Sequence, residues 1–272
     1  MYTYKSIIIL GSNGMLGQMV KRYFTMAKYT VHVIDIRFEE ENCITYVNEI
    51  NKLEDSIVIN CIGKIKQKSG DLFELIWSNT ILPLELSRKL RPGHFLIHPS
   101  TDCVFKGDSE ICYPLSAKHD ADDFYGWTKS IGETAAISNN RTLIIRVSII
   151  GPDYKSNKGL LSWFLNLPTH SELNGFVDHF WNGITTLEWC KQLEKLIKNN
   201  VLISQRGNII QLGTKERYTK FDMLNLFQGA FGTDHNIIKY NSKQNVNRCL
   251  EPQYLSNSLD AQLKELYAFM KL

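Results

Sequence analysis

Short apolar runs alternate with amphipathic stretches along the first half of the chain. Ser6–Leu10 is apolar and rich in β-branched residues, the pattern of a strand buried on both faces. From residue 15 to 24 the apolar residues recur at helical spacing, and further apolar runs cover residues 30–34, 56–63 and 94–98. Strands that alternate with helices, each strand almost entirely apolar, predict an α/β fold with a Rossmann-type doubly wound parallel sheet.

The alternation loosens in the second half of the chain. We therefore expect a dinucleotide-binding Rossmann domain over residues 1–150 and a small C-terminal substrate-binding lobe over residues 151–272, interleaved with returning sheet elements. Residues 187–197 have the pattern of an amphipathic helix, and residues 207–213 that of a strand returning to the sheet. The last helix, from about 259 to 270, is expected to pack at the periphery.

A glycine-rich turn joins the first strand to the first helix. Glycine permits a tight turn, close approach of the backbone to a pyrophosphate, and close packing of helix on strand, while free N–H groups at the helix N-terminus bind phosphate. The spacing is G-x-x-G-x-x-G rather than G-x-G-x-x-G, and a purely structural turn is the alternative. The predicted dinucleotide contacts are Gly11, Asn13, Gly14, Met15, Leu16 and Gly17.

The ends of the next two strands carry further candidates for cofactor binding. Asp35 lies about twenty residues beyond the glycines, where an acid can bind the adenosine ribose hydroxyls, whereas Arg37 would meet a 2′-phosphate. These side chains favour different cofactors, so both NADH and NADPH stay open, and a solvent-exposed pair is the plainer alternative. The predicted contacts at these two strand ends are Asp35, Ile36, Arg37, Cys61, Ile62 and Gly63.

Tyr125 and Lys129 are four residues apart, so they lie on one face of a helix. Free tyrosine titrates near ~10 and is a poor acid or base at neutral pH. A lysine ammonium one turn away would lower the tyrosine pKa, and the pair would then exchange a proton with a carbonyl or carbinol oxygen. Ser100 and Thr101, at a strand terminus, would donate a hydrogen bond to the same substrate oxygen. The plainer alternatives are that Tyr125 and Lys129 are two solvated helix residues, and that Ser100 and Thr101 cap a helix or form a turn.

Composition narrows the class of partner. The chain has 272 residues, of which 43% are hydrophobic and 22% charged, as in ordinary globular proteins. The net charge of +3 comes without a basic block, so no nucleic-acid partner is expected. No apolar run reaches membrane-spanning length, no signal peptide precedes the first strand, and six scattered cysteines show no metal-ligand pattern. We expect a cytoplasmic protein without metal or membrane contact, with a homodimer left open.

These motifs together resemble a known family. The glycine turn, Asn60–Gly63, Asn79, Ser100–Phe105, and Tyr125 with Lys129 occur in the order found in extended short-chain dehydrogenase/reductases. The likeness is greatest to the dTDP-4-dehydrorhamnose reductase branch, and it covers the chain to about residue 190. It implies NADPH or NADH as hydride donor, Asn79 as a further cofactor contact, and a 4-keto-6-deoxy sugar nucleotide as substrate.

The resemblance also implies roles for individual residues. Tyr125 would protonate the developing alkoxide, Lys129 would bond the nicotinamide ribose, and Thr101 would polarise the carbonyl. Residue chemistry, rather than the resemblance, suggests two further contacts. Trp181, in the aromatic-rich stretch 176–181, would stack on the base, with ordinary packing as the alternative. Arg248 would pair with the diphosphate, with a surface position as the alternative. The predicted substrate contacts are Lys64, Ser100, Thr101, Asp102, Cys103, Tyr125, Arg146, Trp181 and Arg248.

Cys103 stands where rhamnose reductases carry tyrosine. Bifunctional 3,5-epimerase/4-reductases, such as GDP-fucose synthase, use a cysteine at the matching place to exchange a proton beside the keto group. Cys103 would face the same side as Thr101, so 3-epimerisation before reduction stays open, with a small buried thiol as the alternative. The second acid/base would be Lys158, with Lys155 or His179 as alternatives.

A narrower resemblance concerns the substrate. Asn60–Gln67 and Leu160–Leu165 are similar to segments of reductases that make UDP-N-acetyl-6-deoxy-L-hexosamines. The substrate would then be UDP-2-acetamido-2,6-dideoxy-hexos-4-ulose and the product UDP-N-acetyl-L-rhamnosamine, with dTDP-4-dehydrorhamnose reduction as the alternative. A 4,6-dehydratase or 4-epimerase is disfavoured because Asp102 is not followed by a second acid. A cofactor-binding regulatory subunit is disfavoured by the intact Tyr125 and Lys129.

Overall fold

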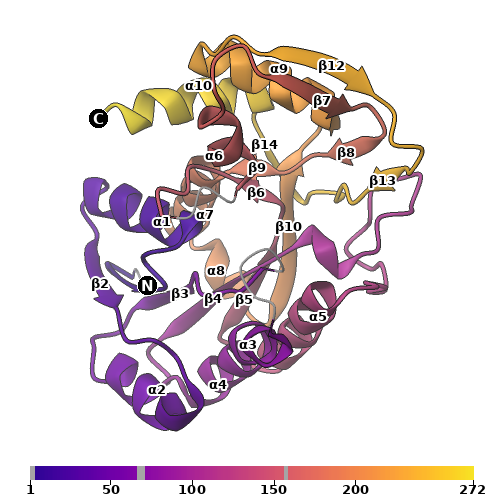
Figure 1. Ribbon diagram of the computed structural model, residues 1–272. Helices are drawn as coiled ribbons and strands as arrows, with labels where there is room; N and C mark the ends of the chain where they lie inside the picture. Colours follow the sequence, from indigo (N-terminus) through magenta and orange to yellow (C-terminus); the bar gives the residue numbers. More distant parts are fainter. Residues whose placement is uncertain (1–3, 66–70, 156–158) are drawn as a thin grey trace.

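A seven-stranded parallel sheet forms the middle of the molecule (Figure 1). The computed structural model describes residues 4–65, 71–155 and 159–272. The strand order is β14-β10-β5-β4-β3-β1-β2, and every pairing in it is parallel, which confirms the predicted Rossmann-type α/β fold. The strands are β1 (Ser6–Leu10), β2 (Thr30–Ile34), β3 (Ile57–Asn60), β4 (Phe95–Ser100), β5 (Thr142–Arg146), β10 (Asn208–Thr214) and β14 (Tyr254–Ser256).

Helices cover both faces of this sheet (Figure 1). Ile7 and Ile9 of β1 lie in a larger hydrophobic core, whereas Ile8 and Leu10 lie in a smaller one, because successive strand residues point to opposite faces. In the described part of the chain, none of the helices is long and apolar enough to span a bilayer. The larger core includes α1 (Met15–Met26), α7 (Thr186–Lys198) and α10 (Leu259–Met270); the smaller includes α2 (Cys43–Asn51) and α4 (Leu82–Lys89), next to which α5 (Phe124–Ile137) packs.

The helix α10 is part of the larger core. Leu259, Leu263 and Leu266 have no exposed surface and belong to the same cluster as Ile7 and Ile9. Its main neighbours are α9 (Lys220–Phe231), β9 (Ile184–Thr185) and α7, so the helix buries its apolar stripe against elements outside the seven-stranded sheet, and its peripheral position stays a prediction.

Three small sheets and the remaining helices, except α8 (Val201–Ser204), which packs on α7, form the upper part of Figure 1. The strand β10 returns to the main sheet, as the pattern over residues 207–213 predicted, and β14 follows it at the sheet edge. The chain thus passes between the two parts repeatedly, and a division at residue 150 stays a prediction. The small sheets pair β6 (Ile149–Ile150) with β9 (Ile184–Thr185), β7 (Glu172–Phe176) with β12 (Asn236–Tyr240), and β8 (His179–Trp181) with both β11 (Tyr218–Thr219) and β13 (Val246–Asn247); the helices are α6 (Leu160–Leu165), α8 (Val201–Ser204) and α9 (Lys220–Phe231).

The direction of the strand order changes between β1 and β3. The chain leaves β1 toward β2 on one side and leaves β3 toward β4 on the other, and open α/β sheets bind ligands in the crevice outside the carboxyl ends at such a point. The turns after β1 and β3 meet there. A Cβ added to Gly11 would lie 2.7 Å from the Ile62 side chain and 3.0 Å from the Ile62 backbone nitrogen.

Candidate active site

The glycine turn after β1 brings backbone segments close together and leaves space at the start of α1. Gly11 has φ +74°, a left-handed conformation that favours glycine, and its carbonyl accepts a hydrogen bond from the Gly14 N–H at 3.1 Å. A Cβ at Gly17 would overlap the Gly11 carbonyl oxygen, whereas a Cβ at Gly14 would come no closer than 3.6 Å to the described protein. Glycine at position 14 is thus not required by protein packing, which leaves room for a phosphate at the start of α1. The turn fits a dinucleotide.

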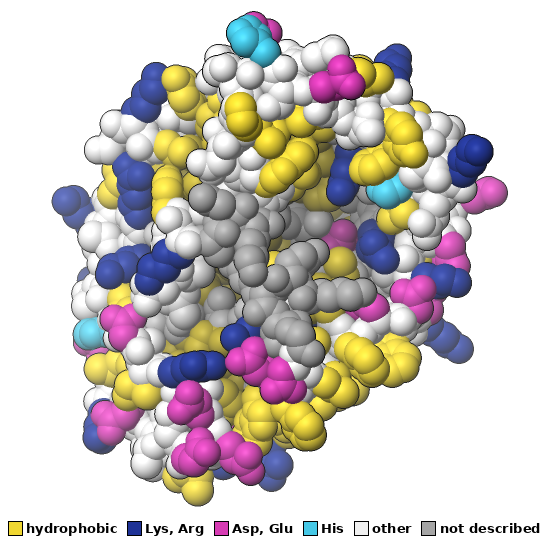
Figure 2. Space-filling model, viewed as in Figure 1, with side chains coloured by type: hydrophobic (Ala, Val, Ile, Leu, Met, Phe, Trp, Pro, Cys, Tyr) yellow, Lys and Arg dark blue, Asp and Glu magenta, His cyan; other side chains and the backbone are white. Residues whose placement is uncertain are grey.

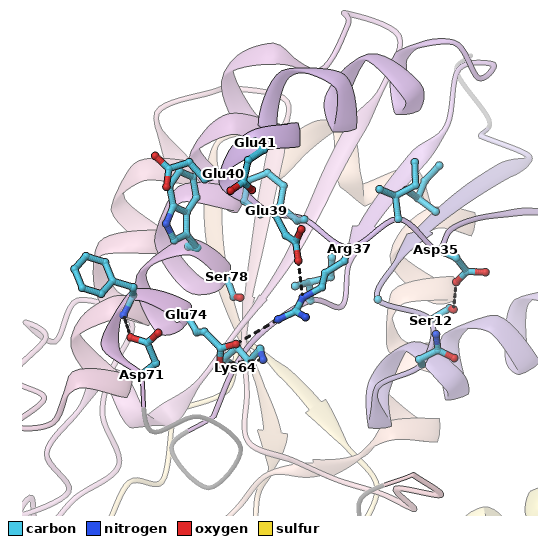
Figure 3. A pocket seen from close by; sticks show the side chains of 18 residues that line it. Ser12, Asp35, Arg37, Glu39, Glu40, Glu41, Lys64, Asp71, Glu74 and Ser78 are labelled. Carbon is cyan, nitrogen blue, oxygen red and sulfur yellow. Dashed lines mark hydrogen bonds and ion pairs between the residues drawn. The ribbon is translucent and has the colours of Figure 1, made fainter.

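A cavity of about 590 Å³ adjoins this turn (Figure 3). Asn13 and Ile62 line it, and Asp35 accepts a hydrogen bond from the Ser12 hydroxyl at 3.0 Å. Arg37 lies between Glu39 and Glu74. Asp35, Ile36, Arg37 and Lys64 all line the cavity, so the structure brings these predicted residues together, whereas Leu16 points into the larger core and Met15 lies beside Gly159.

Asn79 is buried, and its side-chain amide forms hydrogen bonds with other protein groups. It lies on a π-helical segment, Trp77–Ile81, that follows α3 (Leu72–Ile76). Its side chain accepts from the Lys64 N–H and donates to the Lys64 carbonyl, both at 3.0 Å, and donates to the Thr128 hydroxyl at 3.2 Å. Asn79 therefore fixes the turn beyond Cys61 and Gly63 against α5, which places it as a support of the cofactor crevice in this structure.

Thr101 and Tyr125 meet at the carboxyl end of β4. Thr101 caps a single helical turn over residues 102–104, and its hydroxyl accepts from the Cys103 N–H at 3.1 Å and donates to Asp102 at 3.0 Å. Tyr125 lies in the first turn of α5, which Asp123 caps by accepting from the Gly126 N–H at 2.8 Å. The Tyr125 hydroxyl hydrogen-bonds with Thr101, so two side chains that are 24 residues apart in the sequence form one polar group.

Lys129 lies one turn beyond Tyr125 but is directed to the backbone. Its ammonium donates to the Pro99 carbonyl oxygen at 2.8 Å, and burial lowers its pKa to about 8, with Glu133 opposing the shift. Burial and the neighbouring Cys103 raise the pKa of Tyr125 above its ordinary value. The Tyr125 pKa is therefore raised in this structure, against the expectation that Lys129 lowers it, because burial has the largest effect on the phenol.

Cys103 and Asp102 lie beside the Thr101–Tyr125 pair. Burial raises the pKa of Cys103 to about 12, and the nearby Asp102 adds to the effect. Burial also raises the pKa of Asp102, which hydrogen bonds from Thr101 and Ser148 and the charge of Arg248 oppose. Both groups are thus held toward their protonated forms.

Trp181 and Arg248 reach the same place from the second half of the chain. The Trp181 indole donates to the Ser148 hydroxyl at 2.9 Å, and Ser148 in turn bonds Asp102. Arg248 donates to the Phe105 carbonyl at 2.9 Å while its charge acts on Asp102. Six of the predicted residues therefore gather at one site: Thr101, Asp102, Cys103, Tyr125, Trp181 and Arg248.

Arg146 has a structural position instead. It is 1% exposed and forms two hydrogen bonds with the Glu133 carboxylate, at 2.7 and 3.1 Å. It also donates to Gln211 at 2.8 Å and lies 2.8 Å from a His119 ring nitrogen. Four of the five N–H donors of this guanidinium are thus used by protein partners, which speaks against the predicted substrate contact.

The remaining predictions are placed as follows. Ser100 is buried, and its hydroxyl finds no hydrogen-bond partner among the described residues. Lys158 lies outside the described residues. The Lys155 N–H donates to Asp153 at 3.2 Å, and His179 stacks on Phe176 and lies 3.0 Å from the Ser242 hydroxyl.

Sequence reasoning missed three polar residues of the site. Ser148 joins Trp181 to Asp102, and its place directly after the end of β5 was the available signal, because strand ends line the crevice. Glu39 and Glu74 flank Arg37, but they come from different segments and no local pattern pairs them.

The fold and the site define the class. A Rossmann sheet with a glycine turn at its switch point, and with a half-buried Tyr125 beside the buried Thr101 and Lys129 at the same edge, is typical of short-chain dehydrogenase/reductases. The sequence profile of the RmlD substrate binding domain family matches residues 79–267, more than half of the chain, and the chain belongs to this family.

Several solved structures share the fold of this chain. The dTDP-4-dehydrorhamnose reductase from Bacillus anthracis, in complex with NADP, is 17% identical with a TM-score of 0.83, covering 97% of this chain and 99% of that one. A dTDP-4-dehydrorhamnose reductase from Clostridium acetobutylicum is 20% identical with a TM-score of 0.78, covering 98% and 100%. A dTDP-glucose 4,6-dehydratase from B. anthracis, in complex with NAD, is 12% identical with a TM-score of 0.73, covering 98% and 96%. Such low identities show the fold alone. No curated protein sequence gives a significant match.

Proposed function

We propose that the protein reduces the 4-keto group of a nucleotide-linked 4-keto-6-deoxyhexose, with NADPH or NADH as the hydride donor. The observation that carries the proposal is the group of Thr101, Tyr125 and Lys129, at the same sheet edge as the glycine turn. Membership of the RmlD substrate binding domain family supports it, as does the fold shared with dTDP-4-dehydrorhamnose reductases.

The side chains suggest how the work is divided. The glycine turn and Asp35 would hold the diphosphate and adenosine ribose, Lys129 would bind the nicotinamide ribose, and the bound dinucleotide would supply a hydride. The raised pKa of Tyr125 keeps its phenol protonated at neutral pH, the form that gives a proton to the oxygen on C4. The Thr101 hydroxyl can rotate from Asp102 toward the same oxygen and polarise the carbonyl.

We propose UDP-2-acetamido-2,6-dideoxy-hexos-4-ulose as the particular substrate, giving UDP-N-acetyl-L-rhamnosamine, with dTDP-4-dehydrorhamnose as the alternative. Trp181 and Arg248 gather beside Tyr125, where an aromatic ring and a guanidinium would take up the base and the diphosphate. Assaying the purified protein with a panel of UDP-, dTDP- and GDP-linked 4-keto sugars separates these substrates.

The replacement Tyr125→Phe tests the proposed acid. Reduction should fall by about 10²–10⁴-fold, because the proton donor is lost, while dinucleotide binding survives. Nicotinamide absorbance measures the first quantity and calorimetric titration the second. Tyr267→Phe, on α10 outside the site, is the matched control and should keep full activity. Full activity of Tyr125→Phe would remove the assignment. Failure of the wild-type protein with every sugar in the panel would favour a regulatory subunit that binds cofactor without catalysis.

A prior 3-epimerisation is proposed for Cys103, with Lys158, Lys155 or His179 on the opposite sugar face. The thiol lies beside the Tyr125–Thr101 pair, and its raised pKa of about 12 keeps it protonated at neutral pH, so it would return the proton to the sugar carbon after the group on the opposite face has removed one. In deuterated water, epimerisation would place solvent deuterium on C3 or C5 of the product, which mass spectrometry detects. Cys103→Ser should lose the label, whereas Cys43→Ser on α2 should keep it. A product without deuterium would exclude the role.

A further inference from the structure

The cavity beside the glycine turn is strongly acidic. Among the described residues that line it, six are acidic and two are basic. Figure 2 shows Asp and Glu side chains gathered over the part of this face where α2 and α3 lie. The dinucleotide site itself rests on the glycine turn and the crevice, and the acidic groups bear on which dinucleotide it accepts. The acidic residues are Asp35, Glu39, Glu40, Glu41, Asp71 and Glu74; the basic ones are Arg37 and Lys64.

Asp35 lies where an adenosine ribose would be read. It directly follows β2, and the Ser12 hydroxyl of the glycine turn donates to it at 3.0 Å. This bond holds the carboxylate against the turn that would take the diphosphate. A ribose 2′-hydroxyl can donate to such a carboxylate, whereas a 2′-phosphate would be repelled by it.

Arg37 is the side chain that would favour a 2′-phosphate, but its positive charge is already paired with carboxylates. Its guanidinium lies 3.3 Å from Glu39 and 3.3 Å from Glu74 (Figure 3). Glu39 is fixed in place because it forms a reciprocal capping box with Asn42, whose side chain also donates to the Arg37 carbonyl at 2.6 Å. The negative charge is therefore built into the turn after β2.

Glu74 forms ion pairs with both basic residues of the cavity. One of its carboxylate oxygens lies 3.3 Å from Arg37, and the other lies 3.2 Å from Lys64. Exposed ion pairs are individually weak, so the pairing alone would not keep a phosphate out. The excess of carboxylates around the two basic residues adds electrostatic repulsion to this pairing, because a 2′-phosphate brings a charge of about −1.5 to −2 at neutral pH.

We propose that this cavity selects NADH over NADPH, with Asp35 binding the ribose hydroxyls and Glu39 and Glu74 cancelling the charge of Arg37. The proposal rests on the dinucleotide site of the proposed function. It expects NADH to bind at least about tenfold more tightly than NADPH, since like-charge contacts oppose the second ligand. The difference should narrow as salt is raised, because salt screens exposed charges.

Calorimetric titration of the full-length protein with NADH and with NADPH, at low and high salt, measures this directly. Glu39→Gln and Glu74→Gln should each raise NADPH affinity severalfold and leave NADH affinity nearly unchanged, because each keeps its shape and loses one charge. Asp35→Asn should lower NADH affinity. Glu172→Gln, on β7 away from the cavity, is the charge-matched control and should change neither.

Several outcomes would overturn the proposal. They are NADPH binding as tightly as NADH, or Glu39→Gln and Glu74→Gln both behaving like the Glu172→Gln control. Arg37→Gln gives an independent reading: a large loss of NADPH affinity would show that Arg37 binds the 2′-phosphate after all. Sugar reduction with NADPH alone would remove this inference and leave the proposed function intact, whereas failure to bind either dinucleotide would remove both.

Discussion

Lys129 is a charged residue placed almost wholly inside the protein. Only 6% of its surface is exposed, and burial lowers its pKa to about 8, although Glu133 opposes the shift. In an unfolded chain the same lysine titrates near ~10.4. Between these two values the unfolded chain holds more protons than the folded protein, so the contribution of this residue to stability rises with pH across that window.

We therefore predict a pH-dependent difference between the wild-type protein and Lys129→Met. From about pH 8 to pH 10 the free energy of unfolding of the wild type should rise relative to the variant by about 2 kcal/mol. Below that window both states of the wild type carry the proton and the difference should level off. Urea unfolding across the pH range measures it, and a constant difference would show that Lys129 keeps an ordinary pKa.

Spacing in sequence predicted which residues meet, but not how they ionise. Tyr125 and Lys129 do share α5, and Thr101 does reach Tyr125. The direction of the Tyr125 pKa shift depends on burial, which a spacing of four residues does not contain. The prediction for Arg146 misses its surroundings for a similar reason, because its hydrogen bonds with Glu133 and Gln211 depend on segments that no local pattern connects to it.

At the scale of elements, α5 lies very close to the segments that it supports. A Cβ at Gly126 would overlap the Cys103 carbonyl oxygen, and a Cβ at Gly132 would overlap the Asn79 carbonyl oxygen. Glycine at both positions lets one helix rest on the Thr101 turn and on the π-helical segment. The two glycines of the motif around Tyr125 thus have a packing reason that the sequence alone does not reveal.

The replacement Gly126→Ala should push the start of α5 away from Cys103. We expect a loss of about 1–3 kcal/mol in the free energy of unfolding, because the added methyl group has no room. Gly229→Ala is the control: this glycine lies inside α9 with nothing within 4 Å of an added Cβ, so alanine should stabilise by about 0.5–1 kcal/mol. Denaturant unfolding compares the two, and equal tolerance at both positions would contradict the packing argument.

At the scale of the whole molecule, the sheet was the predictable part. The strands β1, β3 and β4 are buried on both faces, so their composition alone marks them, and the glycine turn fixed where the crevice lies. The three small sheets were not predicted, because strands such as β6, β9 and β13 are two residues long and pair with distant segments.

The core beneath β1 also affects how the polypeptide folds while it is being made. Ile7 and Ile9 belong to the same hydrophobic core as Leu193 of α7 and Leu263 of α10, so this core is complete only when segments far apart in the sequence have come together. Until then one face of the nascent sheet remains partly bare. Incompletely covered apolar surface of this kind promotes aggregation and is what chaperones shield, so this protein should depend on such shielding during translation.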